Sequence, residues 1–103
     1  MKGLGGSVVP RVIQHYKENI MNFGDALFNL NHGHRVCREG WNGKGMWINM
    51  QRPDEHSKMT HPYLYIEYPE GHPSYPKGSR IPWLASQTDI LADDWLVLSD
   101  GAI

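Results

Sequence analysis

Residues 21–34, MNFGDALFNLNHGH, carry the clearest structural signal in this sequence. Asn22 is a favourable N-cap residue, and Asp25 follows it by three positions, which is a variant of the capping box. Gly33 supplies a C-terminal stop. The apolar residues between these two signals keep the i, i+3, i+4, i+7 spacing of one buried helix face: Phe23, Ala26, Leu27 and Leu30. We therefore predict the principal helix of the protein here.

Extended segments separated by turns fill most of the chain after this helix. Asn42-Gly43 is a strong hairpin signal, because Asn-Gly favours the tight turns that join antiparallel strands. We predict strands at residues 34–41, 46–50, 63–68, 81–85 and 95–98, and a second, short helix at residues 86–92. These elements indicate an α+β fold with one main helix packed on a small antiparallel sheet.

Period-two alternation assigns the side chains of these strands to the two faces of the sheet. In the second predicted strand, Met46, Ile48 and Met50 share the core-facing side. In the third strand, one face carries Leu64, Ile66 and Tyr68, and the other carries Tyr63 and Tyr65.

The first twenty residues differ in composition from the rest. Residues 1–9 are glycine-rich, and Pro10 suits the first position of a short helix. That helix would carry a partial apolar stripe: Val12, Ile13, Tyr16 and Ile20. We interpret residues 1–20 as an N-terminal extension and residues 21–103 as one domain.

Composition excludes several classes of protein. The chain has 103 residues, enough for one core, and 10 Lys and Arg against 11 Asp and Glu give a formal net charge of -1. A sequence pI near 6.6 argues against binding of DNA or long RNA, which favours basic surfaces. Cys37 is the single cysteine, so no intramolecular disulfide can form and a reducing compartment is expected. Neither a signal peptide nor a run of about 20 apolar residues is present, so we expect a cytoplasmic protein without a membrane partner.

Aromatic residues are numerous for so polar a chain. Four Trp, five Tyr and two Phe accompany a mean hydropathy of -0.54, and many lie beside glycine, proline or polar turns. Aromatic residues beyond the needs of a core are typical of interfaces and stacking sites. The sequence thus favours self-association, binding of a flat ligand, or both.

The possible motifs for phosphate or metal binding do not have the residue spacing that these functions require. GWNGKG at residues 40–45 resembles a phosphate loop, but Lys44 precedes the last glycine and no Ser or Thr follows. His32, His34 and Cys37 are metal-ligand types, but the predicted helix ends between the two histidines.

Nucleophiles and paired carboxylates give no stronger signal. Cys37 and Ser86 lie in no nucleophile signature, and Asp93-Asp94 is interpreted as a solvated pair in a turn. We predict no catalytic residue, metal site or cofactor.

Ser86-Gln87-Thr88-Asp89 fits a capping box, in which Ser86 caps the helix and Asp89 reaches back. Two interpretations stay open. The segment could serve only to start a helix, or its backbone N–H groups could also hold phosphate or ribose while Trp83 supplies a stacking face.

Two motifs together resemble the phage Thoeris anti-defence 2 family: MNFGDALFNLNHGHRVCREGWNGKGM at residues 21–46 and IPWLASQTDILADDW at residues 81–95. The resemblance covers roughly residues 21–98. It implies a non-catalytic sponge: a homotetramer that holds cyclic ADP-ribose isomers made by bacterial TIR-domain enzymes and withholds them from the defence effector. Some members are reported to hold cyclic oligonucleotides as well. It also implies pockets between protomers and a role in the cytoplasm of the infected bacterium.

The resemblance implies a set of ligand contacts in the hairpin and in the second motif: Trp41, Asn42, Trp83, Ser86, Gln87 and Asp89. Strand alternation adds Tyr63 and Tyr65 as further candidates. Cations near the hairpin are candidates for pairing with ligand phosphate: Arg35, Arg38 and Lys44. Two other functions stay open, namely an enzyme that degrades the signal and a protein-interaction module that inhibits a host defence protein directly.

Overall fold

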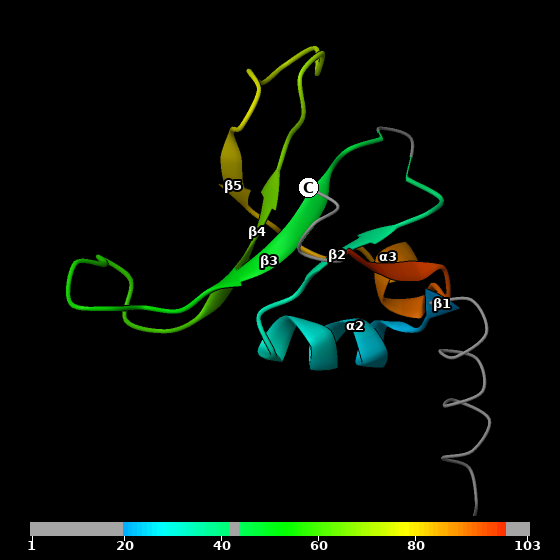
Figure 1. The fold of residues 1–103 in the computed structure, drawn as a ribbon, viewed down its shortest axis with the longest axis horizontal. Helices are drawn as coiled ribbons and strands as arrows, with labels where there is room; N and C mark the ends of the chain where they lie inside the picture. Colours follow the sequence, from blue (N-terminus) through cyan, green and yellow to red (C-terminus); the bar gives the residue numbers. More distant parts are fainter. Residues whose placement is uncertain (1–19, 42–43, 99–103) are drawn as a thin grey trace, which may run out of the picture.

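The computed structural model describes residues 20–41 and 44–98, which form an α+β domain (Figure 1). Its elements are β1 (Ile20–Met21), α2 (Phe23–Asn31), β2 (Arg35–Arg38), β3 (Trp47–Gln51), β4 (Tyr63–Glu67), β5 (Arg80–Pro82), α3 (Gln87–Leu91) and β6 (Trp95–Leu98). The strands form one antiparallel sheet in the order β1-β6-β2-β3-β4-β5, and α2 contacts β2, β3 and β6. The predicted main helix, small antiparallel sheet and short second helix are confirmed.

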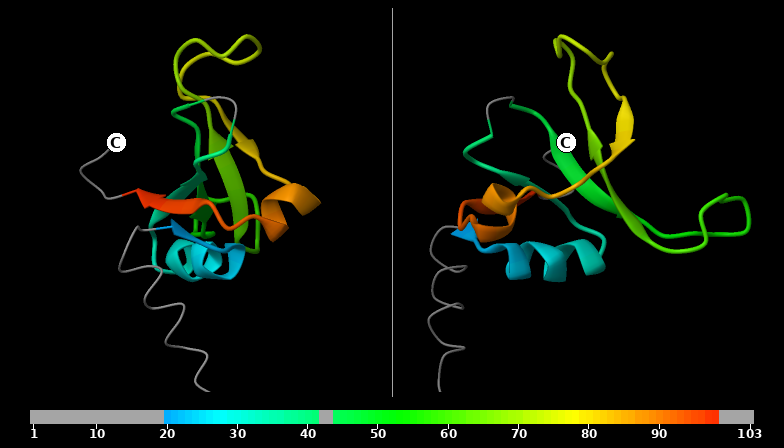
Figure 2. Two further views of the ribbon diagram at one scale, coloured as in Figure 1. Left: turned by 90° about the vertical axis from the view of Figure 1, so that its right-hand side faces the viewer. Right: turned by 180° about the vertical axis from the view of Figure 1, so that it is seen from behind.

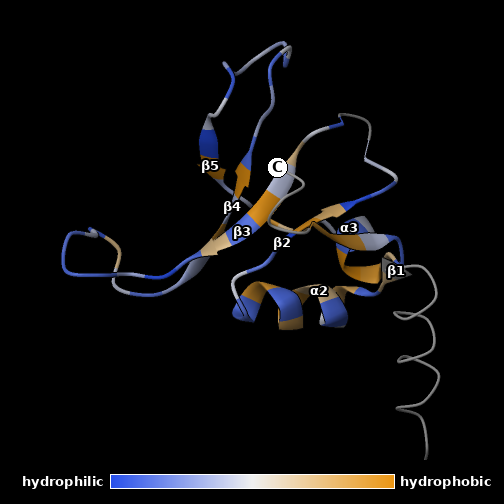
Figure 3. Cartoon of the chain, in the orientation of Figure 1, coloured by the Kyte–Doolittle hydropathy of each residue, from blue (hydrophilic) through white to orange (hydrophobic). Residues whose placement is uncertain are grey.

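The capping box predicted for the main helix is present. The Asn22 side chain accepts a hydrogen bond from the Asp25 N–H at 2.9 Å, and the Asp25 carboxylate accepts from the Asn22 N–H at 3.2 Å. At the other end Gly33 adopts a left-handed conformation with φ of 87°, which glycine tolerates without strain. Both ends of α2 therefore follow from local sequence, and Figure 3 shows hydrophobic and hydrophilic residues alternating along the helix.

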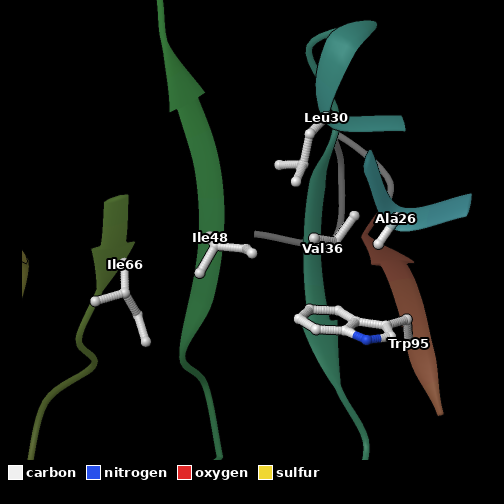
Figure 4. Packing of buried hydrophobic residues seen from close by; sticks show 6 residues of the cluster. All are labelled: Ala26, Leu30, Val36, Ile48, Ile66 and Trp95. Carbon is white, nitrogen blue, oxygen red and sulfur yellow. The ribbon is translucent and has the colours of Figure 1, made fainter. Parts of the chain in front are cut away.

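The core lies between α2 and one face of the sheet. Register pairs Val36 with Ile48, and Ile48 with Ile66, which places these side chains on the same face across three neighbouring strands. Figure 4 shows them side by side, with side chains from α2 and β6 closing the cluster. Its buried members are Ala26, Leu30, Val36, Ile48, Ile66 and Trp95.

The predicted alternation of side chains along β3 and β4 is confirmed, and Trp47 is buried as well although it lies on the other face. Met46, Met50, Leu64 and Tyr68 are partly buried and pack against this core, as their positions require. Trp47 lies on the opposite face and is nevertheless buried, because it contacts Tyr65 edge-on at 6.1 Å and the Arg35 guanidinium lies 5.2 Å from its ring.

The strand that holds the first described residues was not predicted. Ile20, expected on a helical stripe, lies in β1 and pairs with Leu96 of β6. The expected boundary between extension and domain therefore falls inside a strand. The helix predicted from Pro10 and the Asn42-Gly43 turn lie outside the described residues.

Two loops, residues 52–62 and 68–79, extend from the far ends of β3, β4 and β5 (Figure 2). Aromatic contacts hold the second loop, since Tyr68 stacks on Tyr75 with ring centroids 4.9 Å apart and contacts His72 in a tilted arrangement at 4.4 Å. Among the described residues, no helix is long and apolar enough to cross a membrane.

Candidate functional site

Three tryptophans from distant parts of the sequence meet beside α3. Trp41 follows β2, Trp83 follows β5, and Trp95 opens β6. Ring centroids are 5.6 Å apart for Trp41 and Trp95, 6.1 Å for Trp83 and Trp95, and 6.4 Å for Trp41 and Trp83, all in edge-on geometry. Trp95 is fully buried, whereas the other two rings are half-buried. We call these three residues the tryptophan cluster.

One carboxylate fixes this cluster in place. Oδ1 of Asp89 accepts hydrogen bonds from Trp41 Nε1 at 3.1 Å and from Arg38 Nη1 at 2.9 Å. Oδ2 of Asp89 accepts from the N–H and the hydroxyl of Ser86, which completes the predicted capping box of α3. The Asp89 backbone carbonyl also accepts from Trp95 Nε1 at 3.0 Å. A single residue of α3 therefore holds two of the three indoles.

Arg38 connects this carboxylate to a second one. Its Nε donates to Asp94 Oδ1 at 2.7 Å, while Asp94 Oδ2 accepts from the Gly40 N–H at 2.8 Å. A Cβ atom at Gly40 would lie 2.7 Å from Asp94 Oδ2, so only glycine allows this close approach. The Arg38 side chain is only 14 % exposed, and the bridge joins β2, α3 and the start of β6.

The pKa values reflect this pairing. Burial alone would raise the pKa of Asp89, but hydrogen bonds from Arg38, Trp41 and Ser86 outweigh it and lower the pKa below its ordinary value. The hydrogen bond from Arg38 lowers the pKa of Asp94, against an opposing effect of burial. The hydrogen bond to Asp94 raises the pKa of Arg38. The network thus holds two carboxylates and one guanidinium in their charged forms.

The structure brings together part of the predicted ligand-contact set. Trp41, Trp83, Ser86 and Asp89 lie around α3, and Gln87 is exposed at the first position of that helix. Asn42 lies outside the described residues.

Tyr63 and Tyr65 do not join this group. They pair with Gln51 and Asn49 and alternate with the buried Ile66, so they lie on the sheet face opposite the core. Tyr65 contacts Trp47 there, and the Arg80 guanidinium lies 5.4 Å from its ring. Within one chain the tyrosines therefore lie on the other face of the sheet from the core that supports the tryptophan cluster.

Sequence reasoning missed Asp94 and Trp95 as parts of the site, and it assigned Arg38 to ligand phosphate rather than to the two carboxylates that it binds. The interpretation of Asp93-Asp94 as a solvated pair is wrong for Asp94. Its side chain is only 25 % exposed and accepts hydrogen bonds from Arg38 and from the Gly40 N–H. A signal was present for Arg38: it stands two residues after the buried Val36, so alternation places it on the core face of β2.

The three cations near the hairpin are engaged within the chain. Arg38 is paired with both carboxylates, and Lys44 Nζ donates to the Glu39 carbonyl at 2.7 Å. Arg35 lies over Trp47 on the other face of the sheet. A phosphate contact by Arg38 would have to displace two charge-assisted bonds, which are among the stronger interactions in a protein.

The described residues offer little support for a metal site or for a nucleophilic cysteine. No group of three or more His, Cys, Asp or Glu side chains in residues 20–41 and 44–98 could hold a metal ion. Burial raises the pKa of the half-buried Cys37 thiol, which lowers the thiolate fraction available for nucleophilic attack. His32 lies at the C-cap of α2, where Nδ1 is 2.8 Å from the Phe28 carbonyl oxygen.

Surface hollows in the described part of the chain include three that lie near candidate residues. One of about 380 Å³ adjoins the network and is lined by Arg38, Thr88, Leu91, Ala92, Asp93 and Asp94. The other two, of about 230 and 420 Å³, lie by the 52–62 loop and share Met59 and Tyr63. The hollow beside the network is therefore lined by two carboxylates and one guanidinium, and none of the three tryptophans lines it.

Comparison with known proteins places the chain in a family. Residues 21–98 match the model of the Thoeris anti-defense 2-like domain, a range that contains the whole tryptophan cluster and its carboxylates. The chain belongs to the Thoeris anti-defense 2-like family. The protein named Thoeris anti-defense 2 from Bacillus phage SP01 is 39 % identical over 85 residues, which cover 77 % of this chain and 96 % of that relative. The resemblance inferred from the two motifs is confirmed.

The lowered pKa values predict how acid affects the fold. Because the folded pKa values of Asp89 and Asp94 lie below the ordinary value of about 3.9, the stability they contribute is present above that pH and is lost as the pH falls through the folded values. We expect the free energy of unfolding, measured by urea denaturation, to decline below about pH 4.

Asp94→Asn should make that decline shallower, since one of the two titrating groups is gone. Asp93→Asn is the matched control, because it changes the exposed neighbouring carboxylate. Equal acid dependence in Asp94→Asn and wild type would contradict the assignment.

Proposed function

We propose that this chain is a phage anti-defence protein that binds a cyclic nucleotide signal, preferably a cyclic ADP-ribose isomer, and withholds it from the bacterial effector. Family membership supports an anti-defence role, and the resemblance described above implies sequestration without conversion. The protein then acts in the cytoplasm of the infected bacterium, where such a signal is made.

The observation that carries this proposal is the pair of half-buried indoles around Asp89. At 6.4 Å and 61°, Trp41 and Trp83 are in edge contact, so a nucleobase cannot enter between them without separating them. A base would stack on the exposed part of one ring, while the edge-on contact of that ring with Trp95 stays in place. Base–aromatic stacking contributes about 1–3 kcal/mol and requires no particular base.

Polar recognition would come from groups that are not already occupied by the fold. Both oxygens of Asp89 accept bonds from within the chain, so its part in binding is to hold the rings. Gln87 is exposed at the start of α3 and can reach ribose hydroxyls or phosphate. Two carboxylates against one guanidinium leave the network negative, which favours ribose hydroxyl donors near Asp94 and phosphates farther away.

Self-association into a homotetramer, which the resemblance implies, is part of the proposal. Large aliphatic side chains beside the cluster are open to solvent: Leu84 is 91 % exposed, Leu91 80 % and Ile90 46 %. These side chains come from one short stretch, residues 84–91, and apolar surface that is exposed together usually marks an interface. A second copy covering this surface would bury the ligand's free side and slow its release.

Sequestration predicts stoichiometric binding with no turnover. We expect the protein, mixed with a cyclic ADP-ribose isomer, to retain ligand through a wash and to release it unchanged on denaturation, as measured by mass spectrometry. A cleaved product would make the protein an enzyme. Absence of bound nucleotide together with a co-purified host protein would favour an interaction module.

Trp83→Ala should lower ligand affinity about 10-fold or more, because one stacking face is lost. Trp83→Phe keeps a ring and should recover much of the affinity. Tyr75→Ala serves as control, since it removes a partly exposed ring from the distant 68–79 loop. Titration calorimetry measures affinity, and circular dichroism checks the fold. Normal binding by Trp83→Ala would remove this residue from the site.

The assembly should be larger than one 11.8 kDa chain in light scattering at micromolar concentration. Leu84→Asp should shift it towards the monomer, because a charge is then buried at the interface. The matched control is Met59→Asp, which places the same charge on another exposed apolar side chain in the 52–62 loop. A wild-type protein that is monomeric under these conditions would overturn this part of the proposal.

A further inference from the structure

Arg38 is linked to the Trp41 indole through a shared carboxylate oxygen. Its Nη1 and Trp41 Nε1 donate to the same oxygen of Asp89, at 2.9 and 3.1 Å. Its Nε is anchored to Asp94 at 2.7 Å, and Asp94 in turn binds the Gly40 N–H next to Trp41. The ring is thus held at its indole nitrogen and through the backbone beside it.

We propose that Arg38 is a positioning residue: anchored by Asp94, its guanidinium holds the Asp89 carboxylate at the angle at which it accepts the Trp41 indole N–H. The orientation of the Trp41 ring is thereby fixed before any ligand arrives. The consequence for ligand affinity rests on the proposed function, in which Trp41 supplies a stacking face.

The capping box alone does not fix this orientation. Ser86 holds Oδ2 of Asp89, but a carboxylate held by one oxygen can still turn about that contact. Arg38 holds the second oxygen and so sets the plane of the carboxylate. It also neutralises a carboxylate whose side chain is only 13 % exposed, and such a charge without a partner would turn towards water.

The bridge requires arginine rather than positive charge alone. A guanidinium presents several N–H donors in a rigid plane and can bond two carboxylates in different directions at once. The ammonium of lysine is a compact point charge on a flexible chain, so at this site it would favour one carboxylate over the other. Arg38→Lys therefore preserves the charge and removes the bridge.

The first measurement is made without ligand. In proton–nitrogen correlation spectra each tryptophan gives one indole N–H signal, and Trp41→Phe identifies the one from Trp41. We expect Arg38→Lys to shift this signal and to speed its exchange with solvent, while the Trp95 indole signal moves less. Arg52→Lys is the control, because Arg52 donates to the Asn31 carbonyl on another part of the surface.

The second measurement is a double-mutant cycle on the affinity for a cyclic ADP-ribose isomer. Arg38→Lys should lower the affinity about 10-fold, and combined with Trp41→Ala it should lower it no further than Trp41→Ala alone. Losses that add would mean that Arg38 contacts the ligand itself. An unshifted Trp41 signal or additive losses would each overturn the positioning role.

Two further outcomes are decided in the same experiment. If the wild-type protein binds no cyclic ADP-ribose isomer, the proposed function fails, and the ligand-free indole signal alone upholds or overturns the positioning role. If Arg38→Lys does not fold, Asp94→Asn replaces it, because that variant weakens the anchor of Arg38 and leaves Asp89 intact. The same signal should then shift in the same direction, and its constancy would overturn the proposal.

Discussion

The carboxylate of Asp89 is the contact on which the arrangement of this site depends. It accepts from Ser86 within its own helix, from Arg38 on β2 and from the indole of Trp41 beyond β2. α3 has only five residues, too few to be stable alone. Its position is set by these bonds and by the Trp95 indole that donates to its backbone. Removal of this one carboxylate would take away the cap of α3 and the shared acceptor of Arg38 and the Trp41 indole, while Trp95 would keep its bond to the backbone carbonyl.

The three residues of the tryptophan cluster belong partly to the core and partly to the surface. Trp95 is fully buried, whereas Trp41 and Trp83 contact it in edge-on geometry and are only half-buried. The core therefore supports the rings that the proposed ligand would meet. Such rings lose little conformational freedom on binding, which reduces the cost of recognition.

Local features were predictable from sequence, because their signals lie within a few residues of one another. Both capping boxes and the core-facing alternation of β3 were predicted correctly on this basis. The Arg38–Asp94 bridge was not, because it joins residues 56 positions apart. It depends on β6 inserting between β1 and β2, and nothing in the strand patterns specifies that order. Alternation gave the face of Tyr65 correctly, but it carries no information about which other segments lie on that face.

A protein that works by holding a ligand, rather than converting it, has requirements that differ from those of an enzyme. Each copy neutralises a limited number of signal molecules, so affinity and slow release decide its effect. Hydrogen bonds made before binding serve this end, because no polar group of Asp89 or Asp94 has to change partners when a base stacks nearby. The same pre-formed network limits where phosphate can lie, since its surplus charge is negative. Specificity would then come from ribose and linkage geometry at the rim of the rings, where an unmatched buried polar group carries a penalty.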